Sequence, residues 1–191
     1  DDLYAIIGVL QSNNMEIAMP TSLGGLQMFL YQMGGDQYSN GGQTISFDEN
    51  LSISAFELLC NFFQSYKFPV AYDFSNRFRS GEIPMGIMAY TSYTQLSVFA
   101  TEIKGMWEFV PLPGYRDPVT GDVNNDSTSG SSGIIMLKGA RDRNVTYDAW
   151  KFMVWFTSSS AQTNYASEVT AVLGTESKHP TANKKSLYEL P

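Results

Sequence analysis

Segments with a strand pattern alternate with segments with a helix pattern, and this alternation limits the possible folds more than any other feature of the chain. The clearest helix is expected over about 51–66, where Phe56, Leu59 and Phe63 recur at helical spacing. The apolar segment 84–90 is uninterrupted, which is typical of a strand buried on both faces. Alternation of the two patterns predicts an α/β fold.

The remaining elements follow from periodicity and from turn and capping residues. Further helices are expected at the N-terminus (Leu3, Ile6, Ile7 and Leu10 on one face), over about 23–33, 74–79, 92–103 and 147–156, and from 158 onward. Strands are expected at 16–20, 106–110 and 133–138, with a hairpin around the turn 40–42 and its strand 43–47. Thr21 or Ser22, Asp48 and Asp73 are the expected helix caps. Residues 115–132 are predicted to form a loop, and so is most of the tail.

Charge and composition exclude several classes of protein. Only 16% of the 191 residues are charged while 14% are aromatic, which differs from the composition of a disordered chain. The 12 basic and 19 acidic residues give a net charge of −7, with no cluster of Lys or Arg. Nucleic acid and anionic lipid are therefore not expected as partners. No apolar run approaches the roughly 18 residues of a membrane span.

Residues suited to catalysis or metal binding are few. The single cysteine, Cys60, excludes an internal disulfide and a cysteine-based zinc site, and its apolar surroundings favour a small hydrophobe over a reactive thiol. A catalytic dyad or triad would depend on the single histidine, His179, in a loop. No specific context surrounds Glu82, Glu102 or Glu108. We therefore predict no catalytic residue, no metal site and no cofactor.

Two short motifs have simpler explanations than a catalytic or metal site. Residues 122–126 match the first half of a calcium loop, but Ser127 and Gly133 stand where glycine and a bidentate glutamate are needed. An Asx-rich solvated turn is the better interpretation. The segment 129–133 lies before a predicted strand, whereas a nucleophile elbow lies between a strand and a helix.

Two tyrosines follow the predicted buried strand 84–90. Tyr90 and Tyr93 flank Thr91 and Ser92, and ligands of open α/β sheets bind at the carboxyl ends of strands. The tyrosine rings could stack on an apolar ring face while the Thr and Ser hydroxyls form hydrogen bonds. Packing of one tyrosine against the following helix is an equally good explanation. We expect Trp107, Trp150 and Trp155, which lie inside apolar patterns, to be in the core.

The order of four stretches resembles the later part of family 1 extracellular solute-binding proteins of ABC importers, the group that includes maltodextrin-binding proteins. These stretches are the start Asp1-Asp2-Leu3, the segment 78–85 (FRSGEIPM), the segment 107–114 (WEFVPLPG), and 132–136 followed by 148–153 and 158–162. Pro84 stands where the family usually has Ala. The four stretches extend across nearly the whole chain.

The resemblance implies a periplasmic-binding-protein-like (type II) fold, with a central sheet flanked by helices and a solute held in a cleft between two lobes. Residues 1–191 would form the C-terminal portion of such a protein, with the N-terminal lobe largely missing. About 1–130 would belong to the second lobe, about 131–169 would cross the hinge toward the first, and 170–191 would be a C-terminal return. The chain also starts without Met on a helical pattern, so we expect a fragment of a longer protein.

The resemblance also implies where the solute binds. Its segments place the turn Thr21-Ser22, the four residues after the predicted strand and the hinge-side pair Ser131-Ser132 at the cleft. The expected ligand-binding residues are Thr21, Ser22, Tyr90, Thr91, Ser92, Tyr93, Ser131 and Ser132. Maltodextrin-binding members have a Trp near the position of Tyr93, and Tyr keeps an aromatic platform there.

We therefore expect extracellular capture of a small solute, most simply a sugar or oligosaccharide, for delivery to an ABC transporter permease. The protein would be extracellular, at the cell surface or periplasmic, and anchored through a lipid at an absent N-terminus. Two alternatives remain open: an accessory domain of a carbohydrate-active enzyme, and an interaction domain that binds no small ligand.

Overall fold

The computed structural model describes residues 2–47, 49–130, 132–177 and 180–189. The chain divides into two compact units. Unit 1 comprises Asp1–Ser92 and Gly105–Ser129, and unit 2 comprises Tyr93–Lys104 and Gly130–Pro191. Each unit is described by itself below.

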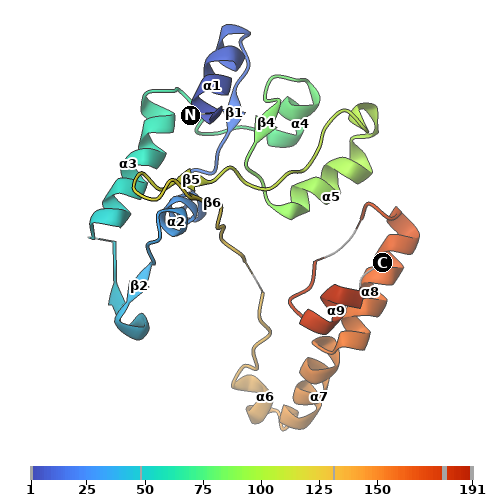
Figure 1. Cartoon of the computed structure of the whole chain (residues 1–191). Helices are drawn as coiled ribbons and strands as arrows, with labels where there is room; N and C mark the ends of the chain where they lie inside the picture. Colours follow the sequence, from blue (N-terminus) through green and yellow to red (C-terminus); the bar gives the residue numbers. More distant parts are fainter. Residues whose placement is uncertain (1, 48, 131, 178–179, 190–191) are drawn as a thin grey trace. The chain divides into compact units, whose positions relative to one another are not determined.

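Three helices build most of the core of unit 1 (Figure 1). They are α1 (Asp2–Ser12), α2 (Leu23–Gln32) and α3 (Asn50–Gln64), and α2 packs against α3. The ring of Phe62 on α3 stacks between Phe29 of α2, at 5.7 Å between centroids, and Phe68, at 5.3 Å. The helix over 51–66 is confirmed, but its buried face differs from the predicted one, because Phe62 is 3% exposed while Phe56 of the predicted face is 55% exposed.

A short parallel strand pair joins distant parts of unit 1. Strand β1 (Ile17–Ala18) pairs with β4 (Met85–Gly86), with Ile17 opposite Met85 and Ala18 opposite Gly86. The amide of Ile87 extends the pairing by donating to the carbonyl of Ala18 at 2.9 Å. Helix α4 (Phe74–Arg79) precedes β4, and the Asp73 carboxylate caps it as predicted, accepting from the amide of Asn76 at 3.1 Å.

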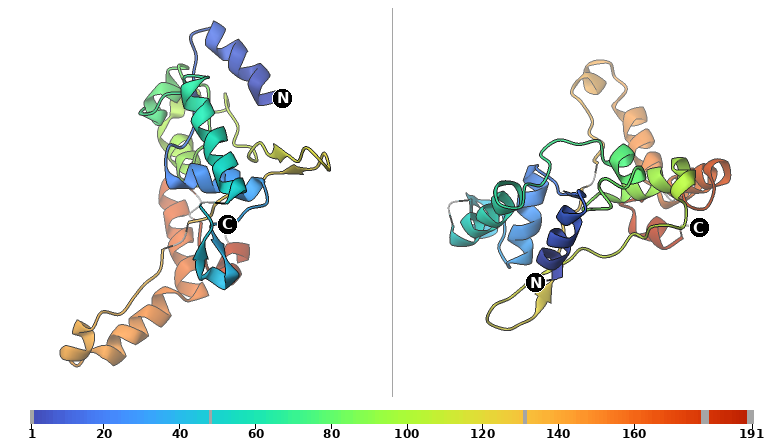
Figure 2. Two further views of the ribbon diagram at one scale, coloured as in Figure 1. Left: turned by 90° about the vertical axis from the view of Figure 1, so that its left-hand side faces the viewer. Right: turned by 90° about the horizontal axis from the view of Figure 1, so that it is seen from above.

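Two antiparallel hairpins complete unit 1. Strands β2 (Tyr38–Ser39) and β3 (Thr44–Ile45) flank the short helix η1 (Asn40–Gly42), which confirms the predicted hairpin. Strands β5 (Tyr115–Arg116) and β6 (Val123–Asn124) form a second hairpin inside the predicted loop 115–132. Both views in Figure 2 show this hairpin projecting from the rest of unit 1.

In the part of unit 2 that the structure describes, all regular elements are helices, and non-helical segments such as 132–136 connect them. Helix α5 (Tyr90–Phe99) begins in unit 1 and continues into unit 2, where η2 (Thr101–Ile103) follows it. The other helices are α6 (Gly139–Asp142), α7 (Thr146–Phe156), α8 (Ser159–Leu173) and α9 (Lys184–Glu189). Helices α7 and α8 confirm the predicted pair around Ser158, whereas α9 lies in a tail that we expected to be mostly loop.

Among the predicted elements, the strands differ most from those in the structure. The strand expected over 84–90 is reduced to Met85–Gly86, which is half-buried, and the ranges 106–110 and 133–138 form no strand. An apolar segment becomes a strand only where a neighbouring strand satisfies its amide and carbonyl groups. In the described part of the chain, no strand pairs with either range.

Several predicted core side chains are exposed. Ile6, expected on the buried face of α1, is 40% exposed, while Ile7 is 1% exposed. Trp150 and Trp155 on α7 are 56% and 60% exposed, so their assignment to the core is wrong. Trp107 is half-buried, with its ring edge-on to Phe78 at 5.8 Å, and Cys60 is also half-buried.

Candidate functional site

The parallel pair β1–β4 provides the frame of the candidate site. Ala18 is fully buried, and the two strands approach so closely that only glycine fits opposite it. A Cβ atom at Gly86 would lie 2.8 Å from Cβ of Ala18 and 2.7 Å from the ring of Phe74. Because the strands are parallel, their carboxyl ends meet at one edge, where ligands of open α/β sheets bind.

Each strand leads from that edge into the first turn of a helix. Residues 19–22 connect β1 to α2, and residues 87–89 connect β4 to α5. The phenol of Tyr72 supports the first connection by donating to the carbonyl of Met19 at 3.1 Å, and burial raises the pKa of this phenol. Helix N-termini carry amide groups without intrahelical acceptors, so this edge of the pair is rich in hydrogen-bond donors.

Thr21 and Ser22 are exposed in the first connection. Ser22 has the extended backbone of an N-cap residue (φ −86°, ψ 173°), but its side chain makes no capping hydrogen bond. Its carbonyl accepts from the amide of Gly25 at 2.9 Å. The Ser22 hydroxyl is therefore not used to cap α2, and it can bind another group.

The four residues expected at the site after β4 form the first turn of α5. Tyr90 is half-buried, and its ring meets Phe109 edge-on at 5.9 Å, at 82° between planes. Thr91 is exposed, and the amide of Ser92 donates to the carbonyl of Ala89 at 2.9 Å. Tyr90 therefore packs against Phe109 and not against the helix that follows the strand, to which it belongs itself, while the hydroxyl-bearing Thr91 stays exposed.

Tyr93 belongs to unit 2 and has a partner that we did not expect. Its phenol donates to Oε2 of Glu176 at 2.9 Å. Glu176 lies 83 residues away in the chain, within a tail that contains no motif, so no sequence pattern relates the two. Phe109 was missed as a partner of Tyr90 because it lies in a segment that we expected to pair as a strand.

Ser131 and Ser132 are the remaining predicted site residues. Ser131 lies outside the described residues, and so do His179 and the expected cap Asp48. Ser132 is exposed in unit 2. The structure therefore places Thr21, Ser22, Tyr90, Thr91 and Ser92 after the carboxyl ends of one strand pair.

Charged side chains gather at the opposite, amino end of the strand pair. The Arg77 guanidinium lies 2.7 Å from Oε2 of Glu16 and 2.9 Å from Oε2 of Glu82. Hydrogen bonds from Arg77 and then from Ser80 lower the pKa of Glu82, and the bonds to Glu82 and Glu16 raise that of Arg77. This ion pair joins the start of β1 to the segment before β4.

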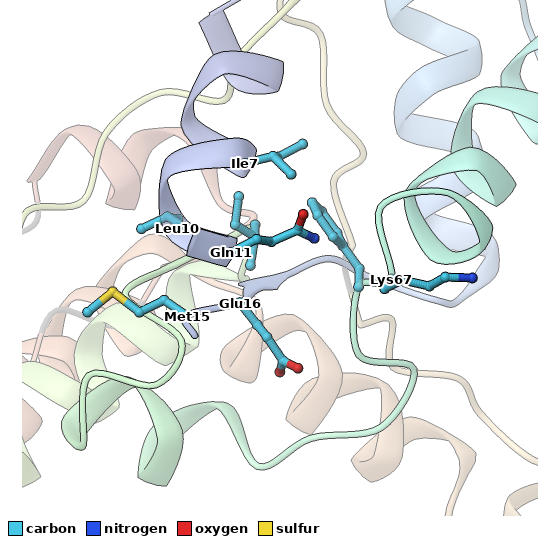
Figure 3. A pocket seen from close by; sticks show the side chains of 8 residues that line it. Ile7, Leu10, Gln11, Met15, Glu16 and Lys67 are labelled. Carbon is cyan, nitrogen blue, oxygen red and sulfur yellow. The ribbon is translucent and has the colours of Figure 1, made fainter. Parts of the chain in front are cut away.

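A small pocket also lies near the amino end of β1 (Figure 3). Ile7, Leu10 and Gln11 of α1 line it, with Met15–Ile17 and the pair Lys67-Phe68. The Gln11 side chain donates to the carbonyl of Tyr66 beside it. This pocket is a gap between α1 and β1, away from the carboxyl edge where the predicted residues gather.

The structure also tests the metal and membrane interpretations. The amide of Asp126 donates to the side chain of Asn124 at 3.0 Å and forms an Asx turn at 124–126, while Val123–Asn124 belong to strand β6. Among the described residues, no three His, Cys, Asp or Glu side chains are grouped so that they could hold a metal ion. A search of the same residues found no helix long and apolar enough to cross a membrane.

Strand-to-helix turns at the carboxyl edge of parallel strands are the places where open α/β sheets bind their ligands. Comparison with protein families matches residues 21–163 to the family described as bacterial extracellular solute-binding protein. The chain belongs to this family, because the match covers well over half of its residues. No curated protein and no solved structure matched the chain.

Family membership defines the general role of the chain. The family binds small solutes outside the cell or in the periplasm and works with ABC transporter permeases. Its members are generally not enzymes. The family has a periplasmic-binding-protein-like fold, with which the helix-rich structure and its small sheets are compatible.

Proposed function

We propose that the protein captures a sugar or oligosaccharide and delivers it to an ABC transporter permease. One observation supports a sugar above other solutes: residues with hydroxyl and tyrosyl side chains follow both strands at the carboxyl edge of β1–β4, Thr21 and Ser22 after one strand and Tyr90 and Thr91 after the other. Sugars offer an apolar ring face to an aromatic side chain and hydroxyls to hydrogen-bonding groups. The charged groups near this strand pair, Arg77, Glu16 and Glu82, lie at its other end.

The proposed mechanism is closure of a two-lobed protein around its solute. We propose that about 1–130 contribute to one lobe, that about 131–169 pass toward the other, and that 170–191 return. The passage of the chain from unit 1 to unit 2 after Ser129 supports the boundary near residue 130, although Tyr93–Lys104 also belong to unit 2. Contacts made to both lobes would favour the closed state, which the permease then recognises. Ser131, Ser132 and a lipid anchor remain predictions from the family resemblance.

A thermal-shift screen tests the proposed solute class. The purified protein is heated with glucose, maltose, maltotriose, cellobiose and xylobiose, and separately with amino acids and polyamines. A solute present at about 100 times its Kd adds roughly 2.7 kcal/mol to the free energy of unfolding, a shift of several degrees. We expect a response confined to saccharides. A response confined to amino acids or polyamines would contradict the proposed solute class.

Substitution of the tyrosines tests the site. We expect Tyr90→Ala and Tyr93→Ala each to weaken saccharide binding about tenfold, or about 1.4 kcal/mol. Tyr188→Ala is the matched control, because Tyr188 lies on a helix and is 87% exposed. Isothermal titration calorimetry gives the three affinities, and unchanged affinity in both test variants would remove the tyrosines from the site.

A further inference from the structure

We propose that Glu176 is a positioning residue of the solute site, which it serves by holding Tyr93; this inference rests on the proposed function. The phenol of Tyr93 donates to Oε2 of Glu176 at 2.9 Å, and both side chains are half-buried in the same compact unit. A hydrogen bond to a charged acceptor is among the stronger side-chain interactions. Glu176 lies outside the family match at residues 21–163, so family membership assigns it no role.

The turn that carries Glu176 is anchored at both of its ends. Gly174 is the C-cap residue directly after α8, and its φ of 93° lies in the left-handed region that favours glycine. The amide of Ser177 donates to the carbonyl of Gly174 at 3.1 Å, and the Ser177 hydroxyl donates to the same carbonyl at 2.6 Å. Ser177 is 1% exposed. The hydrogen bonds between Ser177 and Gly174 therefore fix the backbone of the turn that carries Glu176.

The hydrogen bond orients the ring of Tyr93 without occupying its faces. A phenol hydroxyl lies in the plane of its ring, so the carboxylate of Glu176 meets the ring at its edge. With its hydroxyl bound and its backbone in the first turn of α5, Tyr93 has little freedom to rotate about its two side-chain torsions. A ring held in one orientation loses less entropy when a sugar stacks on it.

A double-mutant cycle separates positioning from direct contact. The saccharide with the strongest thermal response among glucose, maltose, maltotriose, cellobiose and xylobiose is titrated into wild type, Tyr93→Phe, Glu176→Ala and the double variant. We expect each single variant to bind about fivefold to tenfold more weakly, and the double variant no more weakly than either. Additive losses would show that Glu176 contacts the sugar by itself, and would overturn the positioning role.

Two further variants distinguish a structural effect from a positioning effect. Glu176→Gln keeps an oxygen that accepts the phenol hydrogen bond, so we expect it to restore most of the affinity lost in Glu176→Ala. The thermal midpoint of unliganded Glu176→Ala should lie below that of Glu168→Ala, an exposed glutamate on α8, because only Glu176→Ala loses a charged hydrogen bond. A Glu176→Gln variant that regains the thermal midpoint but not the affinity would assign Glu176 to fold stability and overturn the inference.

Failure of the inference can be told apart from failure of the proposed function. If Tyr93→Ala weakens saccharide binding while Tyr93→Phe and Glu176→Ala do not, the result supports the proposed solute site and overturns the positioning role of Glu176. If Tyr93→Ala also binds as wild type, the proposed site fails and the inference fails with it. The same holds if no saccharide in the panel binds.

Discussion

At the residue scale, the contact between Ala18 and Gly86 shows why a strand of only two residues is so well defined. A fully buried alanine faces a glycine whose missing side chain leaves room for the neighbouring strand and for Phe74. Glycine is needed here for close approach, because any Cβ atom would overlap two neighbours. The apolar run 84–90 was visible in the sequence, but the reason for a glycine inside it was not.

Gly86→Ala should therefore destabilise the protein by about 1–3 kcal/mol, because an added methyl group overpacks the β1–β4 contact. Gly8→Ala is the matched control. A Cβ atom at Gly8 meets nothing within 4 Å, and the residue lies inside α1. Removing a helix-interior glycine should stabilise by about 0.5–1 kcal/mol. Urea denaturation of both variants checks this, and destabilisation of equal size in both would contradict the packing argument.

At the element scale, two serines that directly precede helices behave differently. The hydroxyl of Ser158 accepts from the amide of Ala161 at 3.3 Å and so caps α8. Ser22 occupies the same position before α2 without such a bond. The sequence predicted where both helices begin, but the cap expected at Thr21 or Ser22 is not made by the Ser22 hydroxyl, whereas Ser158, which was not predicted as a cap, caps α8.

This difference predicts that substitution by alanine affects stability at Ser158 and saccharide binding at Ser22. Ser158→Ala should lower the free energy of unfolding by about 1 kcal/mol through loss of the cap. Ser22→Ala should change stability by less than about 0.5 kcal/mol and weaken saccharide binding instead. Chemical denaturation gives the stabilities and calorimetry the affinities. A stability loss in Ser22→Ala as large as in Ser158→Ala would mean that its hydroxyl supports the fold.

At the scale of the whole molecule, the two units differ in how well their apolar side chains are covered. In unit 1, α1, α2 and α3 each bury side chains in one shared core. Helix α7 of unit 2 has no buried residue, and Trp150 and Trp155 are more than half exposed. Apolar periodicity predicts which face of a helix is apolar, but burial also requires a second element to pack on that face.

The ion pair of Arg77 predicts how overall stability depends on pH. The hydrogen bond from Arg77 lowers the folded-state pKa of Glu82 below the usual glutamate value of about 4.3. A lowered folded-state pKa contributes stability that is present above the unfolded-state pKa and is lost as the pH falls through the folded-state pKa. Wild type should therefore be more stable than Glu82→Gln at pH 7, and this advantage should decrease at pH values below about 4.

Thermal unfolding of both proteins between pH 3 and pH 7 measures this difference. Glu57→Gln on the exposed surface of α3 serves as the control, and its difference from wild type should vary less with pH. An advantage of wild type over Glu82→Gln that stays constant down to pH 3 would show that the ion pair does not contribute through the Glu82 charge.

The sequence alone predicted the features that depend on neighbours a few positions apart. The helices over Leu23–Gln32, Asn50–Gln64 and Thr146–Phe156, the Asp73 cap and the hairpin at 40–42 all follow from local periodicity, capping and turn chemistry. The order of short motifs along the chain also predicted the family to which it belongs. These features need no knowledge of which distant segments meet.

Only the tertiary structure decided which apolar segments pair, which aromatic side chains are covered and which partner each tyrosine has. The segment 133–138 resembles a strand, yet it does not pair as one, while Met85–Gly86 is paired because Ile17–Ala18 lies beside it. Tyr93 meets Glu176 across 83 residues of sequence. Strand pairing, burial and side-chain hydrogen bonds each require two groups that the fold brings together. A local sequence pattern describes one of the two groups but does not identify its distant partner.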